Sequence, residues 1–151
     1  MNYWIFQCKP DAIVKDVDIE TAIRNKHPFF SEWGVRQYKD DIRKGDKAII
    51  WITGKDARCV ALIDIASNPE VKTDNSLFEV KNQTGKRLKS QNDKVVSINA
   101  HYIPKSVLKD KVKRTKGLEN FNAGRPGSYG TNLTLDKSEY DIIRALSEID
   151  K

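Results

Sequence analysis

The sequence predicts an α+β domain built on a strongly curved sheet or a small barrel. Short apolar runs of strand length recur along the chain, and amphipathic helical patterns stand between and after them. No repeat or linker of flexible composition divides the 151 residues. A chain of this length buries enough core to fold without disulfides or metals, so we expect a single domain over residues 1–151.

The first half of the chain contains three predicted strands and one helix. Residues 3–6 (YWIF) are aromatic and β-branched and stop at a Lys-Pro turn, which is typical of a strand. Residues 16–26 carry apolar side chains at helical spacing behind an aspartate N-cap. The apolar runs 48–52 and 59–66 are of strand length, and we expect them to pair as a hairpin at the centre of the sheet.

The second half is predicted to hold two strands and two helices. Residues 70–93 are polar and predict a loop with one irregular strand, whereas residues 95–103 alternate as a strand does. A proline in the first helical position predicts a short basic helix over residues 104–109. Glycines between residues 117 and 130 predict a loop, and a capping box with an apolar stripe behind it predicts a helix over residues 136–149.

The basic charge is concentrated in one region. The chain has 27 Lys and Arg against 21 Asp and Glu, and eleven of the basic residues but only two of the acidic ones fall between residues 81 and 116. Such a run is either a solvated face or a surface that follows a phosphate backbone. If it follows phosphates, we expect the contacts to come from Lys105, Lys109, Lys113 and Arg114.

The cysteines and the N-terminal residues indicate a compartment. Cys8 and Cys59 each stand in an apolar run, which suits buried free thiols in a reducing environment better than a disulfide. The first residues (MNYWIFQCKPD) lack the basic and apolar regions of a signal peptide or a membrane span. We therefore expect a cytoplasmic protein.

Common catalytic and metal-binding motifs are missing from the sequence. His27 and His101 do not form, with the two cysteines, the close ligand pairs of a zinc site. There is no phosphate-binding loop of the Gly-Lys-Ser/Thr type and no nucleophile elbow, which disfavours nucleotide hydrolysis and esterase chemistry. We expect no metal and no cofactor.

One acidic pattern leaves an enzymatic alternative open. Asp64 on a predicted strand, followed by Glu79 and Lys81, matches the loose Asp and Glu-x-Lys layout with which many nucleases hold magnesium beside a phosphate. Three residue types at so permissive a spacing also arise by chance in a chain that is 32% charged.

Three aromatic residues are interleaved with cations in residues 31–57. The rings are those of Trp33, Tyr38 and Trp51, and the cations are Arg36, Lys39, Arg43, Lys47 and Lys55. A nucleobase stacks on an aromatic face with about 1–3 kcal/mol, and a neighbouring cation can meet its phosphate. The alternative is that these rings belong to the core, where a tryptophan of a small domain is usually found.

The motifs, in chain order, resemble the EVE domain family. They are YWIFQ at 3–7, WGVRQYKD at 33–40 with Ile42, GDK at 45–47, WITGKDA at 51–57, Pro69, and GTN at 130–132 before the final helix. The sequence departs from the family at Arg58-Cys59-Val60 and over residues 81–116. EVE domains have PUA-like folds, are related to the YTH readers of methylated adenine, and are associated with modified bases in DNA or RNA. The resemblance implies a barrel-like sheet with flanking helices and a non-enzymatic pocket for one flipped base.

The resemblance also implies which residues line that pocket. Trp33 and Trp51 would be its walls, and amides and backbone groups would meet the base edge. The full expected set is Trp33, Gly34, Val35, Arg36, Gln37, Tyr38, Trp51, Thr53, Gly54, Lys55, Thr131 and Asn132. The expected partner is DNA or RNA with a modified base, bound by a monomer that acts alone or as a module of a restriction or RNA-processing system. A small-molecule or protein-interaction domain is a further alternative.

Overall fold

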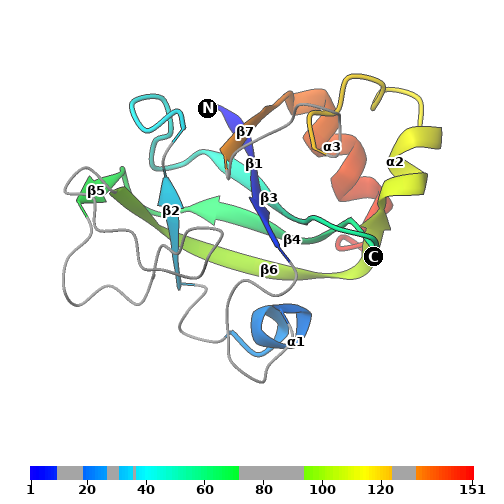
Figure 1. The fold of residues 1–151 in the computed structure, drawn as a ribbon, viewed down its shortest axis with the longest axis horizontal. Coiled ribbons are helices and arrows are strands. Elements are labelled where there is room, and N and C mark those ends of the chain that lie inside the picture. The colour runs from blue at the N-terminus through cyan, green and yellow to red at the C-terminus, as the bar shows by residue number, and fades with distance from the viewer. Residues whose placement is uncertain (10–18, 27–30, 36, 72–93, 124–131) are drawn as a thin grey trace.

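The computed structural model describes residues 1–9, 19–26, 31–35, 37–71, 94–123 and 132–151 (Figure 1). The described elements are β1 (Tyr3–Cys8), α1 (Ile19–Arg24), β2 (Glu32–Val35), β3 (Lys47–Ile52), β4 (Arg58–Ile65), β5 (Glu70–Val71), β6 (Lys94–Leu108), α2 (Lys109–Arg114), β7 (Asn132–Leu135) and α3 (Lys137–Leu146). No described helix is long and apolar enough to cross a membrane.

The strands form one curved, mixed sheet in the order β2-β6-β4-β3-β1-β7, and β5 also pairs with β6. β1 and β3 run parallel, and the other pairs are antiparallel. The predicted hairpin is confirmed, because Ala48 on β3 lies opposite Ile63 on β4. The α+β class is likewise confirmed, with a PUA-like arrangement in which the long β6 runs along the lower side of the view (Figure 1).

Alternate residues of the central strands enter two separate hydrophobic clusters, one on each face of the sheet. The first cluster takes Trp4 and Phe6 from β1 and is covered by α1 through Ala22 and Ile23. The second cluster takes Ile5 from β1 and is covered by α2 and α3. Burying each large apolar side chain contributes about 1.5–3 kcal/mol, so both faces stabilise the sheet.

β6 and its proline correct one prediction. The helix expected over residues 104–109 is wrong, because β6 continues to Leu108 and α2 begins only at Lys109. The register of β6 on β4 shifts between the pairs Ala61↔Tyr102 and Cys59↔Val107. Pro104 lies in this irregular stretch, which is where a strand tolerates a residue with no N–H to donate.

Two short strands were not predicted, and the final helix was. β2 takes up residues that the sequence placed in a polar loop, and β7 follows the glycine-rich segment. α3 begins directly after Asp136. The Asp136 backbone N–H donates to Glu139 Oε1 at 3.0 Å, as the predicted capping box requires. The expected irregular strand is described only at β5, and residues 72–93 lie outside the described part of the chain.

Candidate nucleic-acid interface

The two outer strands of the sheet order, β2 and β7, are joined by side chains. The Asn132 carboxamide Nδ2 donates to the Gly34 carbonyl at 3.3 Å, and the Asn132 backbone N–H donates to Gln37 Oε1 at 3.3 Å. Asn132 is completely buried. Among the described strands no backbone ladder links β2 to β7. We call this junction of Gly34, Gln37 and Asn132 the β2–β7 seam.

Aromatic rings lie directly beneath the seam. Phe6 on β1 is the ladder partner of Asn132, and its ring stacks on the Trp33 indole with the centroids 5.6 Å apart. Trp33 is only 4% exposed and belongs to the first cluster, as does the buried Val35. Trp33 therefore supports the seam from inside the sheet.

Tyr38 is the exposed ring beside the seam. Among the described Phe, Trp and Tyr residues it alone is exposed, at 42%, and one face of its ring lies on Trp4 with the centroids 5.2 Å apart. Its φ of 59° is in the left-handed region, which costs a non-glycine residue about 1–3 kcal/mol. The Tyr38 carbonyl accepts the N–H groups of Asp41 and Ile42, both at 2.9 Å, and so holds this turn.

A buried carboxylate holds the turn onto β1. Asp46 is 4% exposed and accepts the indole N–H of Trp4 at 3.0 Å and the backbone N–H of Arg43 at 3.0 Å. Its other oxygen accepts the backbone N–H of Asn2 at 2.9 Å. Neither Trp4 nor Asp46 was assigned to the site from the sequence, although Asp46 is the central residue of the Gly-Asp-Lys motif.

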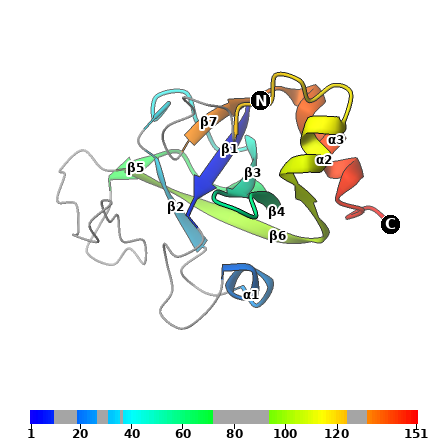
Figure 2. The same cartoon turned by 45° about the vertical axis from the view of Figure 1, so that its right-hand side comes forward.

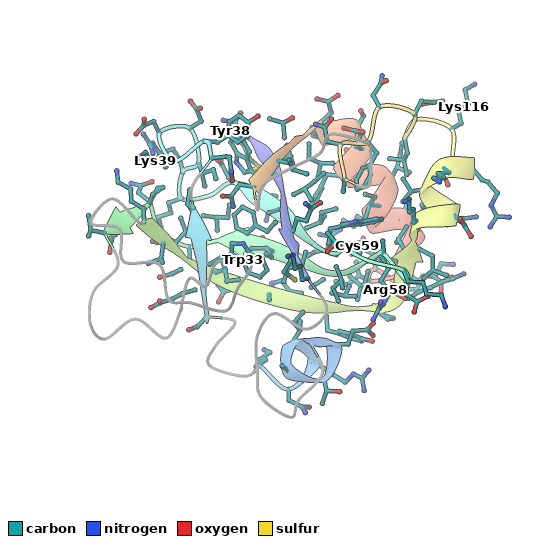
Figure 3. All side chains as sticks on the ribbon, viewed as in Figure 1. Trp33, Tyr38, Lys39, Arg58, Cys59 and Lys116 are labelled. Carbon is teal, nitrogen blue, oxygen red and sulfur yellow. The ribbon has the colours of Figure 1, made fainter. Side chains whose placement is uncertain are left out.

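Cations surround the Tyr38 turn. Lys39 is half-buried, and Arg43 and Lys44 are exposed. The Arg43 guanidinium donates to the Ile42 carbonyl at 2.9 Å rather than to a carboxylate. Figure 3 shows Tyr38 and Lys39 together on one side of the molecule, above Trp33. The turn thus offers an aromatic face next to positive charge.

The structure corrects the predicted pairing of two tryptophans. Trp51 is fully buried in the second cluster, where its indole meets the Phe121 ring edge-on at 5.2 Å. Trp33 belongs to the first cluster, on the other face of the sheet. The prediction that these indoles sandwich one base is wrong, because β3 is a central strand and successive side chains point to opposite faces.

Thr53, Gly54 and Lys55 follow β3 and lie against the end of β1. The Thr53 backbone N–H and hydroxyl donate to the Cys8 carbonyl at 2.8 and 3.2 Å. Cys8 ends β1 just past Phe6, the ladder partner of Asn132. Gly54 has a φ of 108°, which glycine adopts at little cost, and Lys55 is exposed. Arg36 and Thr131 lie outside the described residues.

The predicted phosphate contacts lie away from the seam. Lys105 is on β6, and Lys109, Lys113 and Arg114 are on α2. Figures 1 and 2 both place β2 and α2 on opposite sides of the molecule, and in Figure 3 Lys116, just after α2, is far from Tyr38 across the view. These residues do not adjoin the Tyr38 turn.

Asp64, the described member of the alternative magnesium site, is engaged by cationic and imidazole groups. It forms an ion pair with Lys47, and its other oxygen lies 3.0 Å from His101 Nε2. Partial burial acts to raise the pKa of Asp64, but hydrogen bonds from Lys47 and His101 outweigh it and lower that pKa. Glu79 and Lys81 lie outside the described residues, and within them no three His, Cys, Asp or Glu residues are grouped as metal ligands.

Both cysteines are free thiols, as predicted. Cys59 is fully buried on β4, and burial raises the pKa of its thiol to about 12. A thiol with such a pKa is a weak nucleophile.

Known proteins with this arrangement share the fold at low sequence identity. Rpa0253 from Rhodopseudomonas palustris is 16% identical, with a TM-score of 0.68 over 100% of this chain and 96% of that one. The DUF55 domain of human thymocyte nuclear protein 1 is 16% identical, with a TM-score of 0.59 and coverages of 97% and 99%. The YTH domain of Zygosaccharomyces rouxii MRB1, solved with N6-methyladenosine RNA, is 12% identical, with a TM-score of 0.50 and coverages of 97% and 88%.

The sequence itself matches a family. No curated protein matches it in a search of whole sequences. The EVE domain pattern, in contrast, matches residues 2–146, nearly the whole chain. The chain belongs to the EVE domain family.

Proposed function

We propose that the chain is a non-enzymatic nucleic-acid-binding domain that takes one flipped, modified base at the β2–β7 seam. The observation that carries this proposal is the exposed Tyr38 ring, held on Trp4 beside Gln37 and next to cations. Membership of the EVE family supports it, as does the fold shared with a YTH domain whose structure contains N6-methyladenosine RNA. We further propose a monomer in the cytoplasm, acting alone or as a module of a restriction or RNA-processing system.

Tyr38 replaces the two-tryptophan sandwich as the stacking surface. A base outside its helix needs a ring to stack on and polar groups at its edge. The free face of Tyr38 can supply the stack, worth about 1–3 kcal/mol. The Gln37 amide can both donate and accept, and it is tied to the backbone of Asn132. A methyl group on the base would add about 0.8 kcal/mol when buried against a ring.

The turn cations suit the phosphates on either side of that base. Lys39, Arg43 and Lys44 lie one, five and six residues after Tyr38, and the ion pairs of the described residues include none of them. A cation with no carboxylate partner can meet a phosphate without first breaking an ion pair. Asp64, by contrast, is already engaged by Lys47 and His101, which disfavours its use as a magnesium ligand.

The test compares Tyr38→Ala with Tyr38→Phe, which keeps the ring. Short single-stranded RNA and DNA carrying one N6-methyladenine or one 5-methylcytosine serve as probes, each beside its unmodified match. We expect the parental chain to prefer one modified probe, and Tyr38→Ala to weaken that binding about tenfold or more, in line with the loss of one stack. Tyr38→Phe should bind nearly as well as the parental chain.

Two results would contradict the proposal. One is equal affinity of the parental chain for every modified probe and its match. The other is unchanged affinity in a Tyr38→Ala variant that still melts cooperatively.

A further inference from the structure

We infer that α2 and the residues just after it form a second contact surface, for phosphates of the same strand several nucleotides from the recognised base. This α2 surface consists of Lys109, Lys111, Lys113, Arg114 and Lys116. The inference rests on the proposed function for the kind of polymer. It predicts that the chain contacts a longer stretch of nucleic acid than the seam alone would contact.

The cations of the α2 surface are turned to solvent. Val112 is 5% exposed and is the residue that anchors the helix in the second cluster. Lys111, Lys113, Arg114 and Lys116 are all exposed. Asp110 is the one carboxylate in the helix. The surface is therefore a compact patch with a net positive charge.

These cations also take no part in the ion pairs that five other described cations form. Paired cations are Lys47, Arg58, Lys137, Arg144 and Lys151. No residue of the α2 surface takes part in an ion pair with another described residue, and the Arg114 Nε donates to the Asp110 carbonyl at 3.2 Å. Clustering like charges without partners costs folding free energy, so the patch suits an external polyanion.

Helix stabilisation explains only part of the patch. Cations in the last turn of a helix interact favourably with its dipole by about 0.3–1 kcal/mol, which covers Lys111, Lys113 and Arg114. Lys109 begins the helix, where the same dipole disfavours a positive charge. Lys116 lies beyond the helix end. An anionic ligand would instead favour every one of these positions.

The turn between β3 and β4 lies between the start of α2 and the end of β1. The Lys109 backbone N–H donates to the Ala57 carbonyl at 3.0 Å, so α2 begins against the turn between β3 and β4. At its other end that turn is bonded through Thr53 to Cys8, near Asn132. Lys55 is exposed on this turn.

The length of β6 sets an upper limit on the distance between the seam and α2, and one strand of nucleic acid can cover that distance. Val96 is the ladder partner of Trp33, and Leu108 directly precedes α2. A strand rises about 3.3 Å per residue, so these two positions on β6 are separated by roughly 40 Å at most. Stacked nucleotides are spaced by about 3.4 Å per strand, which makes the span at most on the order of ten nucleotides. We therefore place the second contact on the same strand.

The experiment removes three charges from α2 and, in a control, three from elsewhere. The α2 variant is Lys111→Gln with Lys113→Gln and Arg114→Gln, and the control is Lys26→Gln with Lys137→Gln and Lys151→Gln. Both lose the same formal charge at exposed positions. The probe is an unmodified single-stranded RNA of about 20 nucleotides, somewhat longer than the roughly 4–16 nucleotides that one small fold covers. Affinity is measured over a series of salt concentrations.

We expect the α2 variant to bind the long RNA at least tenfold more weakly at low salt. Its slope of log affinity against log salt should fall by about 0.7 for each lost contact, hence by about 2 in all. The control should keep most of the parental slope. On an RNA of about five nucleotides, too short to reach α2, the variant and the parental chain should bind alike.

The possible failures are distinguishable. Equal salt slopes in the α2 variant and the control overturn the second surface, whether or not the chain discriminates modified bases. A reduced salt slope in the α2 variant supports the second surface. If, in addition, all modified probes bind like their unmodified matches, only the proposal that the chain reads a modified base is rejected. If the α2 variant loses binding to phosphatidylserine vesicles and not to RNA, the surface faces a membrane and our inference is wrong.

Discussion

The Asn132 carboxamide donates a hydrogen bond to the Gly34 carbonyl, 98 residues earlier in the chain, and so joins the two outer strands of the sheet. The bond is buried and has a length of 3.3 Å. It lies where the backbone of β2 and the backbone of β7 do not pair, and Gln37 adds a second bond to the same asparagine. The Asn132 side chain thus helps to close the sheet and to shape the proposed base site.

Asn132→Ala should lower the free energy of unfolding by about 1–3 kcal/mol, because the Gly34 carbonyl would stay buried without its donor. Asn122→Ala is the matched control, since the Asn122 amide donates to the Thr134 carbonyl of the same strand at an exposed site. We expect that control to cost about 1 kcal/mol or less. Denaturant unfolding of both variants checks this. Equal losses of unfolding free energy would show that the buried seam bond contributes no more to stability than the exposed Asn122 bond.

Asp46→Ala should destabilise the chain more and also weaken binding. The substitution removes the acceptor for the indole of Trp4 and for the backbone of Arg43, and leaves these donors in a buried site. Each unsatisfied buried group costs about 1–3 kcal/mol. Because Trp4 carries the Tyr38 ring, loosening it should reduce affinity for a modified probe. Asp46→Asn keeps an oxygen and should lose less in both thermal unfolding and probe titration.

Local signals in the sequence account for the central strands and the last helix. The apolar runs at 48–52 and 59–66 are long enough to be buried on both faces, and they form β3 and β4. Asp136 and Glu139 are a capping box within four residues, which needs no tertiary information, and α3 begins there. Elements defined by their own residues could therefore be predicted.

The remaining features depend on partners distant in the sequence. β2 is short, and its Trp33 becomes a strand residue only because Val96 lies opposite it. Pro104 fits the pattern of a helix start as well as that of an irregular strand. The pairing of Tyr102 and Val107, on either side of it, with β4 decides between them. Which face of β3 receives Trp51 is likewise set by where Phe121 packs. Seam residues could therefore be predicted from the sequence, but the contacts between them could not.

Asp64→Asn should remove part of the pH dependence of stability. The pKa of Asp64 is lowered in the folded chain, so its stabilising effect is fully present above its unfolded pKa of about 3.9 and is lost as pH falls through the folded value. The difference in unfolding free energy between the parental chain and the variant should thus be largest above about pH 4 and shrink at lower pH. Lys47→Gln, which removes one partner of the carboxylate, should reproduce part of this change in acid titrations followed by circular dichroism. If the difference in unfolding free energy between the parental chain and Asp64→Asn stays constant over the acid range, the pKa of Asp64 is not lowered by folding.

Trp51→Phe should leave probe binding unchanged, because the Trp51 ring is wholly buried on the face opposite Trp33. Its effect on stability should be small, since two terms oppose each other. The smaller ring leaves a cavity beside Phe121, but the substitution also removes an indole N–H that has no hydrogen-bond partner among the described residues, a defect that costs about 1–3 kcal/mol. Trp51→Ala, which opens the full cavity, should cost about 3–5 kcal/mol. Thermal unfolding and titration with the preferred modified probe measure both effects, and loss of binding in a stably folded Trp51→Phe variant would show that Trp51, and not Tyr38 alone, contacts the base.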